Sequence, residues 1–284
     1  MGKDTKIAWA RHTFNPWYGC TKISPGCAHC YAEGWAKRSG LVEWGAARRR
    51  SSDAYWQQPL RWNEEAELVG RRASVFCASL ADVFDEEVPD EWRLDLLTLI
   101  KRTPWLTWLL LTKRIGAMER FTERVGLGKT LPLMYDNVWL GITVTSHAEA
   151  ERDIPKLLDT FVGHRFVSIE PMLGAVMPQC LMGIGGDGSY HYLDALAGHY
   201  YIRPKPTPWC KVEWVIAGTE SGPHARRDPA MLNWVRTLRD ACKYAGTPFM
   251  WKQDTINGKT LVLPPLDGVV WNQSPFGVVE RAGK

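Results

Sequence analysis

The sequence lacks the features by which a chain enters or crosses a membrane. Its densest apolar segment, TPWLTWLLLT, is about half as long as a bilayer-spanning helix requires. The opening stretch MGKDTKIAWARHTF contains no apolar run of the kind found in signal peptides. Internal repeats and low-complexity tracts are absent too, and no Gly-rich dinucleotide fingerprint follows the first expected strand. These absences predict a cytoplasmic globular protein with no membrane partner.

The sequence also has little net charge. Its 284 residues carry 35 Lys and Arg against 31 Asp and Glu, which is far from the strongly basic signature of many polyanion-binding domains. The basic residues are uneven, however, with runs at 37–38, 48–50 and 71–72. Trp17, Trp35, Trp44, Trp56 and Trp62 share that region. Such a mixture is typical of nucleic-acid binding, but a solvated basic loop over an aromatic core fits equally well.

Short apolar runs alternate with longer amphipathic segments along the chain. We expect strands at residues 6–9, 74–78, 107–112, 137–144, 165–169, 213–217 and 248–251. Helices are expected at residues 89–103, 146–161 and 228–246. Repeated strand–helix units imply a parallel sheet covered by helices. The sequence therefore predicts an α/β fold, a partial (β/α) barrel of six to seven parallel strands over residues 1–253.

Two stretches interrupt the alternation and are expected to be insertions in the barrel. Residues 39–72 are rich in Arg, Trp and Gly and predict a loop-and-helix excursion. Residues 178–211 are turn-rich and aromatic, as a lid or a substrate-binding element would be. Residues 254–284 are expected to form a C-terminal extension that covers the barrel and includes a short hairpin.

Three of the seven cysteines cluster in the stretch CTKISPGCAHC, as Cys20, Cys27 and Cys30. In a reducing compartment clustered cysteines bind metal more often than they form disulfides. Structural zinc takes four ligands, so zinc would need His12 or His29 to complete the set. An iron–sulfur cluster held by three thiolates keeps one iron open, and a cofactor binds there. The cysteines alone leave both metals open.

Several blocks of the sequence resemble one known family. The stretch FNPWYGCTKISPGCAHCYAE, together with CASLADVFDEEVPDEW, LLLTKR, GITVTS, SIEPMLG, VIAGTESGPHAR and FMWKQ, resembles a family of phage-encoded three-cysteine proteins that are similar to the radical S-adenosylmethionine (SAM) superfamily. The resemblance covers nearly the whole chain. Some blocks also look similar to spore photoproduct lyase relatives, in the Ser/Asp and Thr-Lys elements that end their second and third strands. The gap of six residues between Cys20 and Cys27 departs from the superfamily's commonest spacing.

The resemblance implies a radical SAM enzyme. Cys20, Cys27 and Cys30 would hold a 4Fe-4S cluster, and SAM would bind its open iron. A 5′-deoxyadenosyl radical made from SAM would then abstract hydrogen from the substrate. The substrate that the resemblance implies is a nucleic acid base, in phage DNA modification, isomerisation or repair, with a small metabolite or a peptide as the alternatives. The implied partners are DNA and an electron donor such as flavodoxin or ferredoxin, with the chain acting as a monomer.

Polar residues stand at the carboxyl ends of the expected strands, where such barrels carry their chemistry. As cofactor-binding candidates we predict His29, Ser79, Asp82, Lys113 and Thr143. As catalytic candidates we predict Lys252, Glu170 and Glu220. Most of them have a structural alternative. Asp82 would cap the following turn, Thr143 would only favour a strand, and Glu170 and Glu220 would form internal ion pairs with Lys113 or Lys252. Lys113 or Arg114 would either hold the SAM carboxylate or pair with Glu170. Arg226 and Arg227 are expected on a solvated turn, with contact to a phosphate as the alternative.

Two other classes of protein compete with the radical SAM hypothesis. A non-catalytic nucleic-acid-binding module, stabilised by zinc or by a cluster, predicts salt-sensitive DNA affinity that survives without SAM. Such a module has no need for polar residues at every strand end, which disfavours it. A non-radical SAM methyltransferase is disfavoured because no Gly-rich loop follows the first expected strand.

Overall fold

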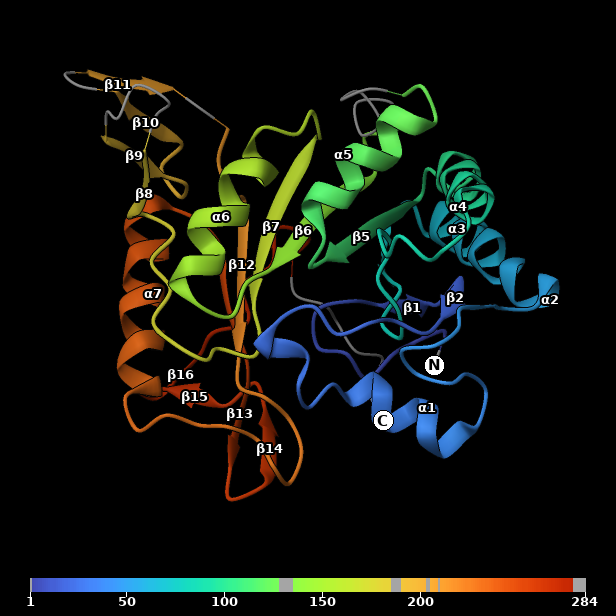
Figure 1. Ribbon diagram of the computed structural model, residues 1–284, viewed down its shortest axis with the longest axis horizontal. Coiled ribbons are helices and arrows are strands. Elements are labelled where there is room, and N and C mark those ends of the chain that lie inside the picture. Colours follow the sequence, from blue (N-terminus) through green and yellow to red (C-terminus); the bar gives the residue numbers. More distant parts are fainter. Residues whose placement is uncertain (1, 128–134, 185–189, 203–204, 209, 278–284) are drawn as a thin grey trace. The chain divides into compact units, whose positions relative to one another are not determined.

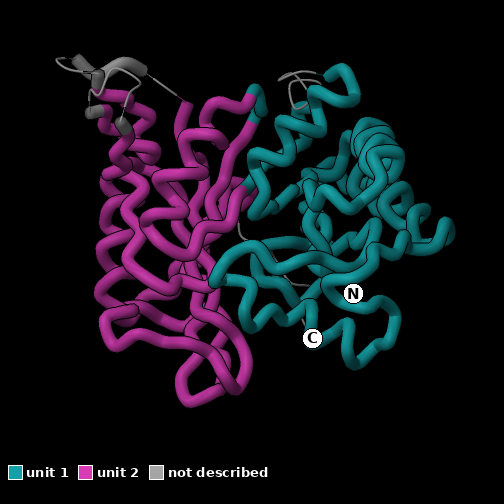
Figure 2. The backbone as a smooth tube through the Cα atoms, in the orientation of Figure 1, with its two compact units in different colours: residues 1–141, 161–163, 279–284 teal, residues 142–160, 164–278 magenta. Residues whose placement is uncertain are grey.

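The computed structural model describes residues 2–127, 135–184, 190–202, 205–208 and 210–277. These residues fall into two compact units, coloured teal and magenta in Figure 2. Unit 1 holds the described residues up to Gly141 together with 161–163, and unit 2 holds the remainder. Within the described ranges, no helix combines the length and the apolar character that a membrane span requires.

Unit 1 is built on short parallel strands that are buried almost throughout. Strand β1 (His12–Phe14) pairs in parallel with β4 (Ala73–Cys77), and β4 pairs in parallel with β5 (Leu106–Thr112). Side chains on both faces of these strands are buried, as expected for a parallel sheet that is covered on both sides. The other elements of unit 1 are β2 (Trp17–Tyr18), η1 (Pro25–Cys27), α1 (Tyr31–Ser39), β3 (Arg49–Arg50), α2 (Asp53–Trp56), α3 (Gln58–Val69), α4 (Asp90–Arg102) and α5 (Ile115–Arg124).

Unit 2 continues the same alternation. Strands β7 (His164–Ile169), β12 (Trp214–Gly218) and β13 (Phe249–Ile256) pair in parallel, and β14 (Lys259–Val262) turns back antiparallel on β13. Ser146 begins α6 (His147–Leu158) by accepting a hydrogen bond from the main-chain N–H of Glu149. The other elements of unit 2 are α7 (Met231–Ala245), β15 (Pro265–Leu266), β16 (Val269–Val270) and an antiparallel sheet of β8 (Leu181–Ile184), β9 (Tyr190–Asp194), β10 (His199–Ile202) and β11 (Lys205–Pro208) (Figure 1).

The main sheet has eight strands in the order β1-β4-β5-β6-β7-β12-β13-β14, where β6 (Val138–Thr143) contains the boundary between the units. It is mixed and mainly parallel, and helices form its crossover connections (Figure 1). The fold is therefore an α/β partial barrel, as the sequence predicts.

The structure confirms the expected strands from residue 74 onward, with shifts of a few residues at their ends. The first expected strand is wrong, because residues 6–9 form a turn and the first strand is β1. The main-chain N–H of Ala10 bonds to the carbonyl of Ile7 in this turn, and pairing to the sheet begins at Arg11. Trp9 is buried against Phe76, with ring centroids 4.4 Å apart. The apolar run therefore packs on the core without being a strand.

Candidate cysteine-loop site and strand-end residues

The three clustered cysteines lie in one segment of unit 1, between β2 and α1. Cys20 follows β2 after one residue, Cys27 ends η1, and Cys30 is the N-cap residue of α1. Ser24 begins η1, where its Oγ accepts a hydrogen bond from the N–H of Gly26 at 3.1 Å. All three thiols are free and half-buried. The Ser-Pro-Gly turn thus reverses the chain within the long gap between the first two cysteines.

Lys22 ties this cysteine loop (residues 20–30) to the helix that follows it. Its Nζ donates to the carbonyl of Ala28 at 3.3 Å and lies 2.7 Å from Glu33 on α1. Glu33 also pairs with Lys37 at 3.0 Å. Hydrogen bonds from Lys22 and then Lys37 lower the pKa of the Glu33 carboxyl. Exposed pairs of this kind contribute little free energy, but they join the start of the loop to its end.

Cys20 is held by a buried arginine that the sequence offers only as an alternative SAM contact. Nη1 of Arg114 donates to Cys20 Sγ at 3.3 Å, and Nη2 donates to the carbonyl of Thr21 at 2.7 Å. Burial raises the pKa of the Cys20 thiol to about 12, and the negative charge of Asp82 adds to this, whereas Arg114 opposes it. The loop is therefore attached to the residue that precedes α5.

Asp82 joins the ends of β4 and β5. Its Oδ1 accepts from the hydroxyl of Thr112 at 2.7 Å and from the N–H of Phe84 at 3.0 Å. Its Oδ2 accepts from the N–H of Lys113 at 3.0 Å and lies 3.4 Å from Nη1 of Arg114. Both carboxylate oxygens are thus engaged within the protein. The structural alternative for Asp82, a turn cap, is present in its bond to Phe84.

A second buried carboxylate, Asp85, pairs with Arg48. Nε and Nη2 of Arg48 lie 2.8 and 2.7 Å from Asp85 Oδ2, and the two side chains are only 2% and 3% exposed. Nη2 of Arg48 also donates to the hydroxyl of Thr21, and Arg114 lies 3.9 Å from Asp85. Two arginines therefore hold Thr21: Arg48 binds its hydroxyl, and Arg114 binds its carbonyl. The sequence gives no sign of this role for Arg48, because it lies within a run of three arginines.

The end of β1 is joined to the end of β4 by Asn15. Its Oδ1 accepts hydrogen bonds from the hydroxyl of Ser79 at 3.2 Å and from the N–H of Leu80 at 2.8 Å. The hydroxyl of Tyr31, the first residue of α1, donates to the carbonyl of Ser79 at 2.7 Å. Ser79 thus lies between the first strand and the helix that follows the cysteine loop. Sequence reasoning missed Asn15 because the strand that it follows, β1, was itself not predicted.

Gly19 precedes Cys20 and allows the backbone to approach closely. Its φ of +102° is rarely adopted by residues with a side chain. A Cβ at this position would lie 2.4 Å from the carbonyl oxygen of Ala47. The N–H of Gly19 bonds to the carbonyl of Leu80 at 3.1 Å. Only glycine fits where the chain enters the cysteine loop.

The predicted catalytic residues belong to unit 2. Lys252 on β13 lies 2.5 Å from Glu170, which follows β7, and both side chains are 18% exposed. Glu220, two residues after β12, accepts hydrogen bonds from the N–H and the guanidinium of Arg226 at 2.6–3.0 Å. The structural alternative is thus present for Lys252 and Glu170, which form an ion pair. Thr143, at the end of β6, is buried.

Arg226 and Arg227 follow a turn and remain partly exposed, as predicted, but both are held by ion pairs that the sequence does not indicate. Arg226 is paired with the buried Glu220, and Arg227 makes two hydrogen bonds to the buried Asp254, at 3.0 and 3.1 Å. These hydrogen bonds raise the pKa of both guanidinium groups. Both arginines hold the segment after β12 in place.

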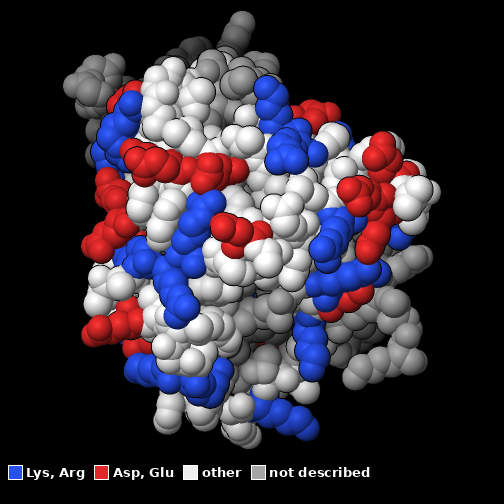
Figure 3. All heavy atoms as spheres, turned by 90° about the vertical axis from the view of Figure 1, so that its right-hand side faces the viewer, with Lys and Arg blue, Asp and Glu red and all other residues white. Residues whose placement is uncertain are grey.

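Three of the five tryptophans in the basic first quarter of the chain are core residues, and Trp35 and Trp44 are half-buried. Trp17, Trp56 and Trp62 are buried in the core of unit 1, and Arg48 is buried in its ion pair. Of the other arginines, Arg50 pairs with Asp95 at 2.8 Å. On the face drawn in Figure 3, acidic and basic side chains are interspersed. The aromatic-core alternative therefore holds for these residues.

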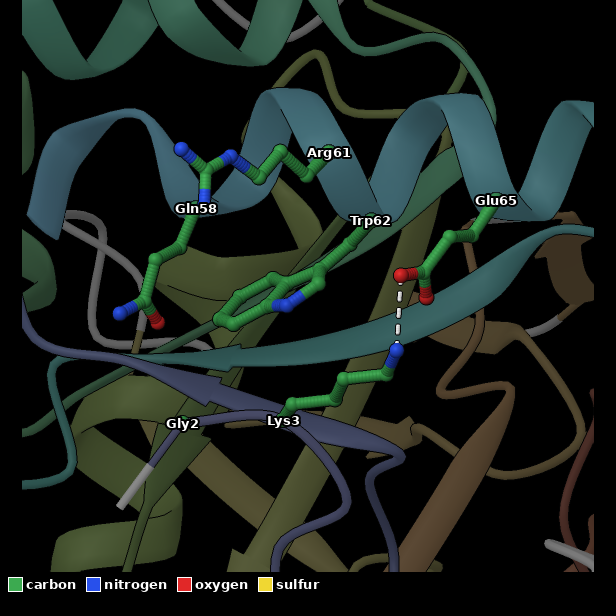
Figure 4. A pocket seen from close by; sticks show the side chains of 6 residues that line it. All are labelled: Gly2, Lys3, Gln58, Arg61, Trp62 and Glu65. Carbon is green, nitrogen blue, oxygen red and sulfur yellow. Dashed lines mark hydrogen bonds and ion pairs between the residues drawn. The ribbon is translucent and has the colours of Figure 1, made fainter.

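A pocket of about 450 Å³ opens in unit 1 away from the cysteine loop. Its lining consists of Gly2, Lys3, Gln58, Arg61, Trp62 and Glu65 (Figure 4). Lys3 and Glu65 pair across it at 2.7 Å and are each about half exposed. None of the predicted site residues lines this pocket, and it carries no part of the proposed chemistry.

The donor chemistry of the cysteine loop fits an iron–sulfur cluster. Three free thiols on one segment supply the sulfur ligands that such clusters take. His29 is exposed between Cys27 and Cys30, while His12 is buried in a stack on Trp62 with ring centroids 4.5 Å apart. Within the described part of the chain, no three His, Cys, Asp or Glu side chains yet converge closely enough to bind a metal ion. The sulfurs would have to draw together on loading.

The fold and this site define an α/β partial-barrel protein with a three-cysteine loop after its first strands. The chain belongs to the family described as Protein of unknown function (DUF5131), whose profile matches residues 4–275. No curated protein matches its sequence.

Solved structures of spore photoproduct lyase resemble the chain distantly, and two of them illustrate the likeness. One is a mutant of spore photoproduct lyase with bound AdoMet and dinucleoside spore photoproduct, at 10% identity and a TM-score of 0.38, over 86% of this chain and 77% of that chain. The other is spore photoproduct lyase complexed with dinucleoside spore photoproduct, at 10% identity and a TM-score of 0.39, over 86% of this chain and 75% of that chain.

Proposed function

We propose that the chain is a radical SAM enzyme in which Cys20, Cys27 and Cys30 hold a 4Fe-4S cluster. The observation that carries the proposal is the set of three free, half-buried thiols on one loop, which is hydrogen-bonded to the exits of two barrel strands. Three sulfur ligands leave one iron open for SAM. When bound, the cluster and SAM supply a one-electron cleavage that yields a carbon radical able to take hydrogen from the substrate.

For the binding of SAM we propose His29, Ser79, Lys113 and Thr143 as contacts, and Asp82 as a residue that supports them. The side chain of Lys113 makes no ion pair with any described residue, so its ammonium group is available to a carboxylate. The oxygens of Asp82 already accept hydrogen bonds, so its contribution is to hold the residues after β4 and β5 in place. Ser79 follows β4 in the same unit as the cysteines and is buried.

For the substrate we propose a nucleic acid base, with Lys252, Glu170 and Glu220 as the residues that orient it. Support comes from the sequence resemblance of the strand ends and from the chemistry of these groups. A carboxylate and an ammonium group side by side can accept from and donate to the polar edge of a base. Glu220, already bonded to Arg226, would act by keeping the segment after β12 in place.

Anaerobic reconstitution with iron and sulfide tests the proposed cluster. The wild-type protein should become brown, contain about four irons per chain, and cleave SAM to 5′-deoxyadenosine under reductant. Cys20→Ala, Cys27→Ala and Cys30→Ala should each abolish both properties. Cys210→Ala is the matched control, since this exposed cysteine lies outside the loop, and it should retain both. Stoichiometric zinc without SAM cleavage would refute the proposal.

The proposed substrate class has its own test. DNA deuterated in its bases should transfer deuterium into 5′-deoxyadenosine, whereas a peptide of similar charge should not. Salt-sensitive DNA binding without any SAM cleavage would instead identify the non-catalytic binding module.

A further inference from the structure

We propose that Arg114 is a positioning residue that fixes Cys20 before a cluster is loaded, so that the cysteine loop has one anchored ligand and two that close onto it. The inference rests on the proposed function for its role in cluster binding. The contact between Arg114 and Cys20 can be tested without that function.

The contacts of Arg114 reach four different groups. It donates to Cys20 Sγ and to the carbonyl of Thr21, and it lies 3.4 Å from Asp82 and 3.9 Å from Asp85. Its side chain is only 10% exposed. A buried guanidinium needs its charge matched and its N–H groups satisfied. The two carboxylates match the charge, and the cysteine loop accepts two of the N–H groups.

Arg114 precedes α5 and is held there by the chain itself. Its N–H donates to the hydroxyl of Thr112 at 2.8 Å, and that hydroxyl donates in turn to Asp82. Arg48 holds Thr21 from a second direction through its pair with Asp85. The position of Cys20 is therefore set by the ends of β4 and β5.

Among the described residues, the other two cysteines have no side-chain hydrogen bond except to a neighbour in sequence. Cys27 has its Sγ 3.9 Å from the hydroxyl of Ser24, three residues earlier. Cys30 is the N-cap residue of α1 without a side-chain capping bond. Neither thiol has a described hydrogen bond to another strand end. This asymmetry is why we assign the anchoring role to Cys20 alone.

A positive group that donates to a cluster ligand also has a chemical consequence. Hydrogen bonds to cluster sulfurs and nearby net charge set the reduction potential of iron–sulfur centres. The guanidinium of Arg114 would favour the reduced, more negative state. Weakening its bond to Cys20 should therefore lower the midpoint potential.

A double-mutant cycle in the metal-free protein tests the contact. Arg114→Lys keeps the charge beside Asp82 but cannot bond both Cys20 and Thr21 in the same way. Urea unfolding of Arg114→Lys, Cys20→Ala and the double variant should show a coupling of about fivefold in the unfolding equilibrium constant. The matched cycle with Cys27→Ala should be additive. Additivity in both cycles would overturn the proposal.

A second measurement needs no arginine variant, in case Arg114→Lys fails to fold. In protein labelled with ¹⁵N-arginine, Cys20→Ala should shift one buried guanidinium signal, and Cys27→Ala should leave it in place. An unchanged guanidinium spectrum in Cys20→Ala would equally overturn the contact.

The loaded protein separates this inference from the proposed function. Reconstituted Arg114→Lys should bind fewer irons per chain than the wild type, and its cluster should have a lower midpoint potential. Arg165→Lys is the control. Arg165 is a buried arginine of unit 2 that donates to main-chain carbonyls, and its replacement should change neither the iron content nor the midpoint potential. An unchanged iron content and potential in Arg114→Lys would refute the role in cluster binding. If no variant and no wild-type sample forms a cluster, the proposed function fails, while the double-mutant cycle still decides whether Arg114 anchors Cys20.

Discussion

Replacing Gly19 by Ala should disrupt the entry to the cysteine loop. The φ of +102° opposes any Cβ, at a cost of about 1–2 kcal/mol. The new methyl group would also lie 2.4 Å from the carbonyl oxygen of Ala47, so the backbone would have to shift. Overpacking of this kind costs about 1–3 kcal/mol more. We therefore expect Gly19→Ala to lower the free energy of unfolding by about 2–5 kcal/mol.

Gly45 provides the matched control for this change. It has a φ of +90°, but a Cβ there meets no atom within 4 Å. Gly45→Ala should therefore lower the free energy of unfolding only by the backbone cost of about 1–2 kcal/mol. The stabilisation that comes from the lower entropy of the unfolded chain is common to both variants. Urea unfolding followed by tryptophan fluorescence compares the two, and iron content after reconstitution should fall only for Gly19→Ala. Equal losses of stability would refute the reasoning from close approach.

Three further predictions concern residues outside the loop. His12, whose Nδ1 accepts from the N–H of Asp4, has its pKa lowered to about 4 by burial. As the pH falls below 6.5, the imidazole of His12 therefore takes up a proton in the unfolded chain before it does so in the folded chain. The free energy of unfolding should fall by up to about 3 kcal/mol as the pH drops from 6.5 to 4. Urea unfolding at a series of pH values measures this dependence, and His12→Phe should remove it. Lys252→Met should lower the free energy of unfolding by about 3 kcal/mol because it leaves Glu170 unpaired in a largely buried site. In a deuterium-transfer assay the same variant should lose substrate turnover while it still cleaves SAM without a substrate reaction. Asn137→Ala removes a buried amide whose two N–H groups are shared among three main-chain carbonyls at 3.0–3.3 Å. Thermal unfolding should therefore show a loss of about 1–3 kcal/mol in the free energy of unfolding, with unchanged iron content.

The sheet could be predicted because its strands are buried on both faces. Runs such as those of β5 and β12 are apolar almost throughout and are bounded by turn residues, which is the pattern of a covered parallel sheet. The first strand could not be predicted in this way, because β1 has the sequence HTF and a more apolar stretch lies just before it. Its assignment depends on pairing with β4, which is more than 50 residues away.

The site was predictable where chemistry is encoded by spacing, and not where it depends on contacts distant in sequence. Cys20, Cys27 and Cys30 stand out in the sequence because three thiols lie within eleven residues. The bond from Arg114 to Cys20 joins residues 94 positions apart, and that from Arg48 to Asp85 joins residues 37 positions apart. No periodicity indicates such pairs, and a run of arginines suggests a solvated surface instead.

The buried side chain of Arg48 gives the loop a built-in proteolytic reporter. Trypsin cleaves after arginine only when that side chain can enter its specificity pocket. In the folded chain Arg48 is 2% exposed and is held by Asp85, and the next two residues belong to the short ladder of β2 and β3. The peptide bond after Arg48 is thereby protected for as long as its side chain remains bound to Asp85 and Thr21. Cleavage there would report, one molecule at a time, that the segment leading to the first cysteine has come loose.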